Sequence, residues 1–411
     1  MRRIVTCCKY ALLAAPLDGL VGRTAYRSAA FSAAFAIRLC GTQQPPLARG
    51  NLEDLHKSAA EFFERGDFIN AIKQWEAVME SLGKVDAGSS NSNNVLMSCL
   101  NNMACAYGEI GHHAKKLELL ERSHDMVKEI YGTDHPQYGL VLYNMASAYE
   151  EMGRYTEMED LLLKSAAIYE RKFNPKHAKV GRVLLLLAEA HGHLGKCEAQ
   201  LQVAERAFEI VRRHCGAEHI QTTIAMLTLS RAHGANGNHA KRLQLAQQAY
   251  EVQERKLGAM NPQIALTLME LAVAHGANGD HFHQKLLLEK AIEVQKRAFG
   301  SQHTHLVSTY TALGDAYGEL DDRKNQAASY CEALDIARKR YRGRHLAIGN
   351  AANKCAWGYL RIGKVEEAKT LAEEARSIIE GIVSEKHPAA VELRATLEEL
   401  KKMSSEKGEK P

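Results

Sequence analysis

The sequence predicts an all-α protein in which about eight helix–turn–helix units stack into a solenoid. Two stretches first indicate this, because residues 232–249, AHGANGNHAKRLQLAQQA, are written again with few changes at 274–291, AHGANGDHFHQKLLLEKA, 42 positions later. The same step of 42 carries columns of equivalent residues through most of the chain. Within each step, glycines divide the unit into two segments of helical length, as expected for a repeat made of two helices.

A column of rings and a column of glycines mark the repeat. Steps of 42 from the quoted pair reach an aromatic or imidazole ring every time, at Tyr107, Tyr149, His191, His233, His275, Tyr317 and Tyr359. Four residues after each ring the unit has glycine, with Asp321 as the one exception. A further, less regular unit precedes these seven, because Gly66 lies 45 residues before Gly111.

A third column is predicted to begin the first helix of each unit. It is histidine in six of seven units, at His135, His177, His219, His303, His345 and His387, with Asn261 in the remaining one. Proline follows it at three of these positions. Proline is favoured at the first position of a helix, so this column is interpreted as turn and helix-start chemistry.

Small residues are expected to set the distance between helices. In the first segment of a unit, Leu268, Leu271, Ala272 and His275 follow the i, i+3, i+4, i+7 pattern of one buried helix face. Small residues recur at Ala104, Ala146, Ala188, Ser230, Ala272, Gly314 and Ala356 in the first helices, and at Ala207, Ala249, Ala291, Ala333 and Ala375 in the second. Since one helix pair cannot bury both of its faces, stacked pairs would share a continuous core.

Residues 1–50 differ in composition from the array expected at 51–400. They hold seven basic residues and the single acid Asp18, and they are rich in alanine and serine. This composition is typical of a mitochondrial transit peptide, and arginines interrupt the apolar run that a secretory signal would need. We therefore predict a mitochondrial protein, with the matrix as its compartment. At the other end, residues 401–411, KKMSSEKGEKP, are polar and are predicted to form a disordered tail.

Charge and cysteine usage argue against several other classes. Outside the first 50 residues the chain has 46 basic and 48 acidic residues, so a nucleic-acid partner is not expected. No segment has the run of about 20 apolar residues that a membrane span needs. The six cysteines beyond the leader form no C-x-x-C pair and are interpreted as small buried apolar residues in a reducing compartment.

The residues suggest no catalytic group, cofactor or metal. His191, His233 and His275 would form a ladder, with His239 and His281 nearby, but equivalent side chains of packed helices lie roughly 10 Å apart, too far to share an ion. Half-buried rings that replace tyrosine are the preferred interpretation. No nucleophile elbow, paired acid motif or dinucleotide fingerprint occurs, so the chain is not expected to be an enzyme.

With these columns in place, the repeat resembles the tetratricopeptide repeat over about residues 55–400. LNNMACAYGEIG at 100–111 and LLEKA at 287–291 carry the resemblance, and endings such as YGTDHP at 131–136 make it similar to the 42-residue repeats of kinesin light chains. The resemblance implies a right-handed α-solenoid that binds a protein or peptide in a concave groove. The chain lacks the heptad segment of kinesin light chains, and the alanine usual early in the second helix is replaced in six middle units by Lys116, Met158, Gln200, Arg242, Gln284 and Gln326.

By analogy with the family, the first helices would line the groove. The predicted wall consists of Arg182, Leu185, Glu189, Ile224, Leu227, Arg231, Leu266, Met269 and Val273, with Gly192, Gly234 and Gly276 leaving room beside it. Flanking units would add Asn101, Tyr143, Asp315, Trp357 and Arg361. The alternative for each wall residue is that it packs against neighbouring helices. An apolar peptide or helix that bears an acidic group would suit this wall.

Three functions are compatible with the array. The first is a non-catalytic mitochondrial scaffold or adaptor that binds a partner protein, with a role in the assembly of a larger complex. The second is an RNA-binding helical repeat of mitochondrial RNA metabolism, against which the 42-residue step and the acidic body argue. The third is a cytosolic adaptor similar to kinesin light chains. The partner and the oligomeric state do not follow from the sequence.

The leader generates a testable prediction. We expect the mature chain to begin between about residue 38 and residue 52, where the arginine-rich segment gives way to an acidic helix. N-terminal sequencing of the protein recovered from mitochondria would locate the new terminus. Recovery of a chain that still begins at Met1 from the organelle would contradict the targeting hypothesis.

Overall fold

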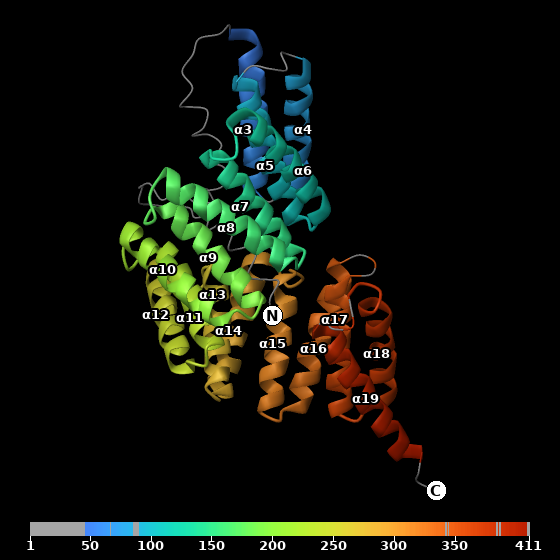
Figure 1. Cartoon of the computed structure of the whole chain (residues 1–411). Helices are drawn as coiled ribbons and strands as arrows, with labels where there is room; N and C mark the ends of the chain where they lie inside the picture. The colour runs from blue at the N-terminus through green and yellow to red at the C-terminus, as the bar shows by residue number, and fades with distance from the viewer. Residues whose placement is uncertain are drawn as a thin grey trace. The chain divides into compact units, whose positions relative to one another are not determined.

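The structure, a computed structural model, describes residues 46–408 except 66, 85–89, 342, 344, 384 and 386–387. The described residues form 17 helices, α3 to α19, and no strand (Figure 1). The predicted all-α repeat fold is confirmed. Most of the predicted leader lies outside the described residues, and α3 begins at Pro46, before the expected start of the array. Among the described helices, none is both long and apolar enough to cross a bilayer.

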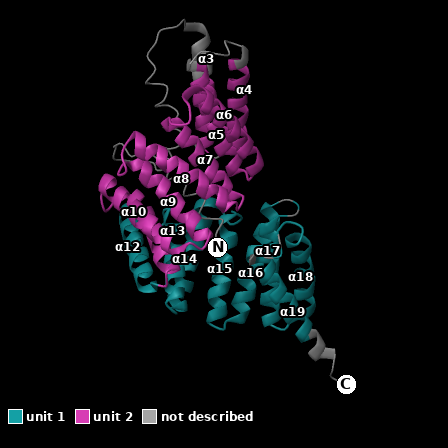
Figure 2. Cartoon of the chain, in the orientation of Figure 1, with its two compact units in different colours: residues 1–4, 238–411 teal, residues 5–237 magenta. Residues whose placement is uncertain are grey.

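The chain divides into two compact units after Gly237 (Figure 2). The helices of unit 2 are α3 (Pro46–Glu64), α4 (Phe68–Lys84), α5 (Ser90–Glu109), α6 (His113–Tyr131), α7 (Pro136–Glu151), α8 (Tyr155–Lys172), α9 (Ala178–His193), α10 (Cys197–Cys215) and α11 (Ile220–Ala235). Those of unit 1 are α12 (His239–Leu257), α13 (Ile264–Ala277), α14 (His281–Phe299), α15 (His305–Glu319), α16 (Arg323–Arg340), α17 (Leu346–Arg361), α18 (Val365–Ile379) and α19 (Pro388–Gly408). The sequence predicts one continuous array. The division falls between α11 and α12, which are the two helices of one predicted repeat.

Within each unit the helices pack as the small-residue columns predict. Consecutive helices contact each other, and some first helices also contact the next first helix, as α9 does with α11 and α15 with α17. Ala104, Ala146 and Ala188 are fully buried in the first helices, and Ala207 and Ala291 are fully buried in the second. Small side chains at these positions let the two backbones approach closely.

The turns between helices use the glycine column. The column glycines Gly111, Gly153, Gly195, Gly237, Gly279 and Gly363 adopt positive φ angles, a conformation that glycine reaches without steric cost. Asp321 is the exception seen in the sequence, and it adopts the same conformation, with φ of 55°. Its carboxylate accepts hydrogen bonds from Arg323 Nε at 2.9 Å and from Arg361 at 3.3 Å, both on the surface.

The histidine column begins helices, as predicted. In His135, His177, His219 and His345, Nδ1 accepts the backbone N–H two residues later at 3.1–3.2 Å. The imidazole therefore satisfies one of the free donors of the first turn, as serine or aspartate does in other helices. Several of these rings also stack on an aromatic residue at or just after the end of the preceding helix, for example His345 on Tyr341 at 4.0 Å between centroids.

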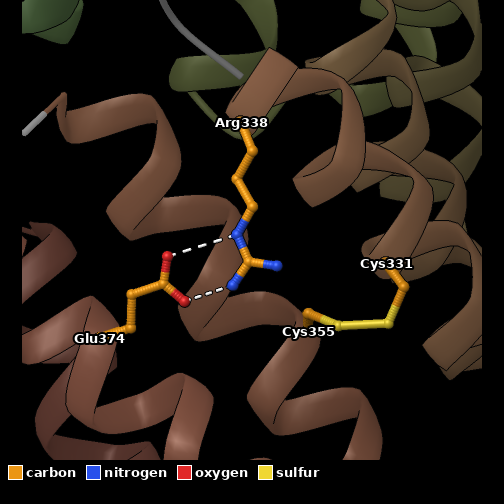
Figure 3. The surroundings of a disulfide bond; sticks show 4 residues. All are labelled: Cys331, Arg338, Cys355 and Glu374. Carbon is orange, nitrogen blue, oxygen red and sulfur yellow. Dashed lines mark hydrogen bonds and ion pairs between the residues drawn. A yellow bond between two sulfur atoms is a disulfide. The ribbon is translucent and has the colours of Figure 1, made fainter. Parts of the chain in front are cut away.

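A disulfide joins Cys331 of α16 to Cys355 of α17, with 5.2 Å between the Cα atoms (Figure 3). The interpretation of the cysteines as isolated apolar residues is wrong for this pair. The two cysteines lie beside Ala333 and Ala356 of the small-residue columns, so the helices approach closely enough for the sulfurs to bond. Figure 3 also shows Arg338 of α16 paired with Glu374 of α18.

The C-terminal end differs from the expected tail. Helix α19 continues to Gly408, so residues 401–408 prolong the helix, and residues 409–411 lie outside the described part of the chain. Met403 follows Leu400 by three residues on the same helix face, and both pack in a cluster with Leu360. The one apolar residue of this polar segment therefore extends the buried stripe of the helix.

The conformation of Asp321 generates a prediction. We expect Asp321→Ala to lower the free energy of unfolding by about 1 kcal/mol, because alanine keeps the strain of a positive φ angle and loses the local hydrogen bonds of aspartate. Asp321→Gly should unfold at the same or a higher denaturant concentration than the natural chain, since the lost surface ion pairs contribute only about 0–1 kcal/mol. Gly363→Ala, at φ of 79°, is the matched control and should also destabilise. Equal stability of the two Asp321 variants would contradict this account.

A second prediction concerns acid stability. Burial lowers the pKa of His305 to about 4, and the neighbouring His303 contributes. Because the folded pKa lies below the unfolded value of about 6.5, the neutral ring favours folding above that pH, and the stability is lost as the pH falls toward 4. We expect His305→Gln to remove about 1–2 kcal/mol of the loss between pH 7 and pH 5.

Glutamine is a conservative choice, because Gln221 and Gln263 occupy the equivalent position of the two preceding repeats. Urea unfolding at a series of pH values would measure the effect. Parallel pH profiles for the natural chain and the His305→Gln variant would show that this ring does not govern acid sensitivity.

Candidate partner-binding surface

The candidate surface is one face of the first helices. In α9 this face carries Arg182, Leu186, Glu189 and His193, whose spacing of i, i+4, i+7 and i+11 places them on one side of the helix. We call these residues and their equivalents 42 positions apart the first-helix face. In unit 2 it lies on α5, α7, α9 and α11, and in unit 1 on α13, α15 and α17.

Arg182 of this face lies beside Tyr143, which belongs to the adjacent column of Leu185, in unit 2. The guanidinium of Arg182 lies 5.7 Å from the centre of the Tyr143 ring, a cation–π arrangement between α9 and α7. Tyr143 is buried, and this burial raises the pKa of its hydroxyl. Arg182 is half-buried, and its Nε is inaccessible to solvent and has no hydrogen-bond partner among the described residues.

Glu189 and Arg231 also come together, as an ion pair between α9 and α11. Thr228 Oγ1 donates to Glu189 at 3.1 Å and accepts from Arg231 at 3.2 Å, so the three side chains form one network. Both charged side chains are more than four-fifths buried, at 11% and 17% exposure. The charge of Arg231 is therefore balanced by its own chain.

Polar pairs continue the face toward α5. Asn144 of α7 donates to Asn101 of α5 at 3.4 Å. At the end of α7, Glu151 accepts hydrogen bonds from His113 at 2.8 Å and Lys116 at 2.7 Å. Burial would raise the pKa of Glu151, but these hydrogen bonds and the charge of Lys116 outweigh it and lower the pKa. Lys116 replaces the usual alanine, and its buried ammonium is paired with Glu151.

Four apolar residues of the predicted wall are buried. Leu185 and Ile224 belong to the core cluster of unit 2, and Leu227 is equally inaccessible. In unit 1, Met269 accepts hydrogen bonds at its sulfur from Gln295 and Thr309. Leu185, Ile224 and Met269 therefore pack against neighbouring helices, because their partners belong to adjacent helices. This is the alternative that the sequence left open for the wall residues.

The room predicted beside the wall is filled. A β-carbon on Gly192 would lie 2.5 Å from the amide of Gln200, and one on Gly276 would lie 2.5 Å from Gln284. These glutamines come from the second helix of the same repeat, at the position where outer units have alanine. The glycines at these two positions therefore admit a large side chain of the protein itself and leave no space for a partner there.

The part of the face in unit 1 is more apolar at one end and charged at the other. Leu266 and Val273 of α13 are half-buried, as predicted for a contact surface. On α15, Asp315 accepts hydrogen bonds from Tyr330 at 2.5 Å and Lys354 at 3.1 Å. On α17, Trp357 is half-buried, and the exposed Arg361 pairs with Asp321 at 3.3 Å.

The prediction missed the polar partners on this face. Asn144, Thr228 and Lys354 occupy one column of the 42-residue step, and each contacts a predicted residue of the neighbouring first helix. The fact that these three residues share one column of the repeat could have indicated that they lie on the same face. A cavity of about 350 Å³ in unit 1 lies away from this face and is lined by the disulfide, Arg338 and Tyr359, among others.

The histidine ladder separates into individual pairs. His191 contacts Glu159 at 3.1 Å, whereas His275 contacts Asp280 at 3.0 Å. Lys196 also contacts Glu159, at 2.6 Å. His191 therefore pairs with an acid of the preceding helix α8, and His275 with the acid of its own turn.

Comparison with known proteins agrees with the 42-residue units. Family models of the tetratricopeptide repeat match residues 96–157, 139–212, 222–263, 264–305 and 307–340, which is more than half of the chain. A search of curated protein sequences finds no match. The similar solved structures are helical repeat proteins.

Three of these structures indicate the range of similarity. The kinesin light chain TPR-like repeats of Podosopora anserina are 25% identical over 48% of this chain and 93% of that chain, with a TM-score of 0.42. The apo quorum sensor NprR from B. thuringiensis is 12% identical over 85% of this chain and 92% of that chain, with a TM-score of 0.59. Rap protein complexed with competence and sporulation factor is 11% identical over 98% and 100%, with a TM-score of 0.59.

The latter two similarities concern the fold alone. The assignment depends on the repeat itself, in which a small-residue column, a glycine turn and a helix-starting histidine recur every 42 residues and the family models match in register. The chain belongs to the tetratricopeptide repeat family.

Proposed function

We propose that this protein is a non-catalytic mitochondrial scaffold that binds an acidic segment of a partner protein on its first-helix face. Arg182 is the observation that supports this most directly. Its side chain is half-buried beside the Tyr143 ring, and it forms no ion pair with a described carboxylate. A partly desolvated cation without an ion-pair partner favours a carboxylate from outside, to which the accessible part of a guanidinium can donate.

The other charges of the face support Arg182 as the contact. Arg231 is balanced by Glu189, and Lys354 by Asp315, so neither requires an acid from outside. A partner carboxylate would therefore gain most at Arg182, with the Tyr143 ring beside it.

The composition of the face disfavours RNA as the partner. Glu151, Glu189, Glu270 and Asp315 all lie on it. Lys116, Arg231 and Lys354 are paired with three of them, so these cations are not free to displace the counterions of a nucleic acid. RNA binding is therefore kept only as the alternative that a filter-binding assay would reveal.

The proposed location in mitochondria, with the matrix as compartment, rests on the composition of residues 1–50. The disulfide offers an independent way to examine the compartment, since disulfides persist in oxidising compartments and are reduced elsewhere. Trapping of free thiols at cell lysis would report the state of Cys331 and Cys355. A reduced pair agrees with the matrix, and an oxidised pair would favour another compartment.

The role of Arg182 generates a prediction. Peptides selected from a random display library against the full chain should be enriched in aspartate and glutamate. Their dissociation constants for Arg182→Gln should be about tenfold higher than for the natural chain, because a hydrogen-bonded charged pair contributes about 1.5–3 kcal/mol. The difference should shrink at high salt. Fluorescence polarisation with labelled peptides would measure both effects.

Arg213→Gln is the matched control, because Arg213 is an exposed cation on the second helix α10 of the same repeat. It should bind the selected peptides as tightly as the natural chain. Selection of peptides without acidic residues, or equal binding by the Arg182→Gln variant, would contradict the proposal.

A further inference from the structure

A second group of side chains converges at the turn between α13 and α14, in unit 1. His275 lies near the end of α13, Asp280 precedes α14, and His283 lies in its first turn. Nδ1 of His275 and Nδ1 of His283 both contact the same oxygen of Asp280, Oδ2, at 3.0 Å and 2.7 Å. The three ligand atoms lie within 4.8 Å of one another.

The turn holds these side chains in place. The backbone N–H of Asp280 donates to the carbonyl of His275 at 3.0 Å, and Gly279 makes the reversal possible with φ of 79°. Asp280 uses its other oxygen, Oδ1, to accept the backbone N–H of His283 at 3.1 Å. The two imidazole rings stack with their centres 5.4 Å apart. The site is therefore organised by backbone bonds that involve none of the three ligand atoms.

The ligand set has a defined chemical preference. Two imidazole nitrogens and one carboxylate oxygen suit Zn²⁺, Cu²⁺ or Ni²⁺, whereas Ca²⁺ and Mg²⁺ require oxygen ligands. An aspartate carboxylate supplies the negative charge that such an ion requires, and the oxygen Oδ2 of Asp280 already lies between the two imidazoles. The His283 side chain is 60% exposed, which leaves the outer side open for a water molecule as a fourth ligand.

We propose that His275, Asp280 and His283 bind one divalent transition-metal ion, for which Zn²⁺ is the probe. Binding requires both Nδ1 atoms to present lone pairs, so the protons of the two rings move to Nε2 and the ion replaces the hydrogen bonds to Asp280. The bound ion would connect the end of α13 to the start of α14. It would thereby stabilise this turn of the solenoid.

The repeats of the chain itself provide variants that preserve the fold. One repeat later, Tyr317, Asp322 and Asn325 occupy the three positions, and Asn325 N–H donates to Asp322 as His283 does to Asp280. His275→Tyr and His283→Asn therefore copy a natural repeat. One repeat earlier, Asn238 stands at the Asp280 position and still accepts the Lys241 N–H at 3.0 Å. Asp280→Asn thus keeps the helix cap and removes the carboxylate.

The experiment titrates ZnCl₂ into the metal-free full chain by isothermal calorimetry. We expect one ion per chain at this site, and a dissociation constant at least tenfold higher in the His275→Tyr, His283→Asn and Asp280→Asn variants. His239→Asn is the control, because His239 is an exposed histidine at the start of α12, and it should bind as the natural chain does. Zn²⁺ should raise the melting temperature of the natural chain and of this control only.

Two results would overturn the proposal. One is equal Zn²⁺ affinity, or no measurable binding, in the natural chain and the three site variants, with circular dichroism showing that all are folded. The other is a thiolate charge-transfer band when Co²⁺ replaces Zn²⁺, because it would assign the ion to cysteines such as Cys197 or Cys215, which are free in the structure.

Discussion

The close approach of neighbouring helices is the constraint on which the rest of the structure depends. Alanine, serine or glycine occupies the contact in every first helix, and these residues are buried throughout. Gly314 shows how little room is available, since a β-carbon there would lie 2.4 Å from the ring of Tyr330. Because the helices approach at the same point in each repeat, the turn glycine and the helix-starting histidine must recur at the same distance, which accounts for the constancy of the period.

Side-chain volume is exchanged across several pairs of helices. Where the second helix begins with a large residue, as at Gln200, Gln284 and Gln326, the first helix has glycine opposite it. In the pair α17–α18 the second helix has the small Ala368 and the first helix has the large Leu360 opposite it, so here the larger side chain belongs to the first helix. The exchange preserves dense packing, and it explains why the glycines do not widen the candidate surface.

Charges on the first-helix face are mostly balanced within the chain. Glu189 with Arg231 and Asp315 with Lys354 link consecutive first helices, so these pairs stabilise the stacking of repeats as well as shaping the surface. Arg182 stands apart because its neighbour is the Tyr143 ring. The turn after α13 is the other exception, since one carboxylate there serves two histidines and the start of α14.

The period alone establishes the helix pairs, the small contact residues, the turn glycines and the helix-starting histidines, because each depends on local geometry that every repeat copies. Burial of Leu185 and Met269, the Cys331–Cys355 bond and the convergence of His275, Asp280 and His283 were decided by tertiary structure. These features depend on which side chains of adjacent helices and turns meet. A column of equivalent positions cannot reveal such pairs, since it compares residues that occupy the same place in different repeats.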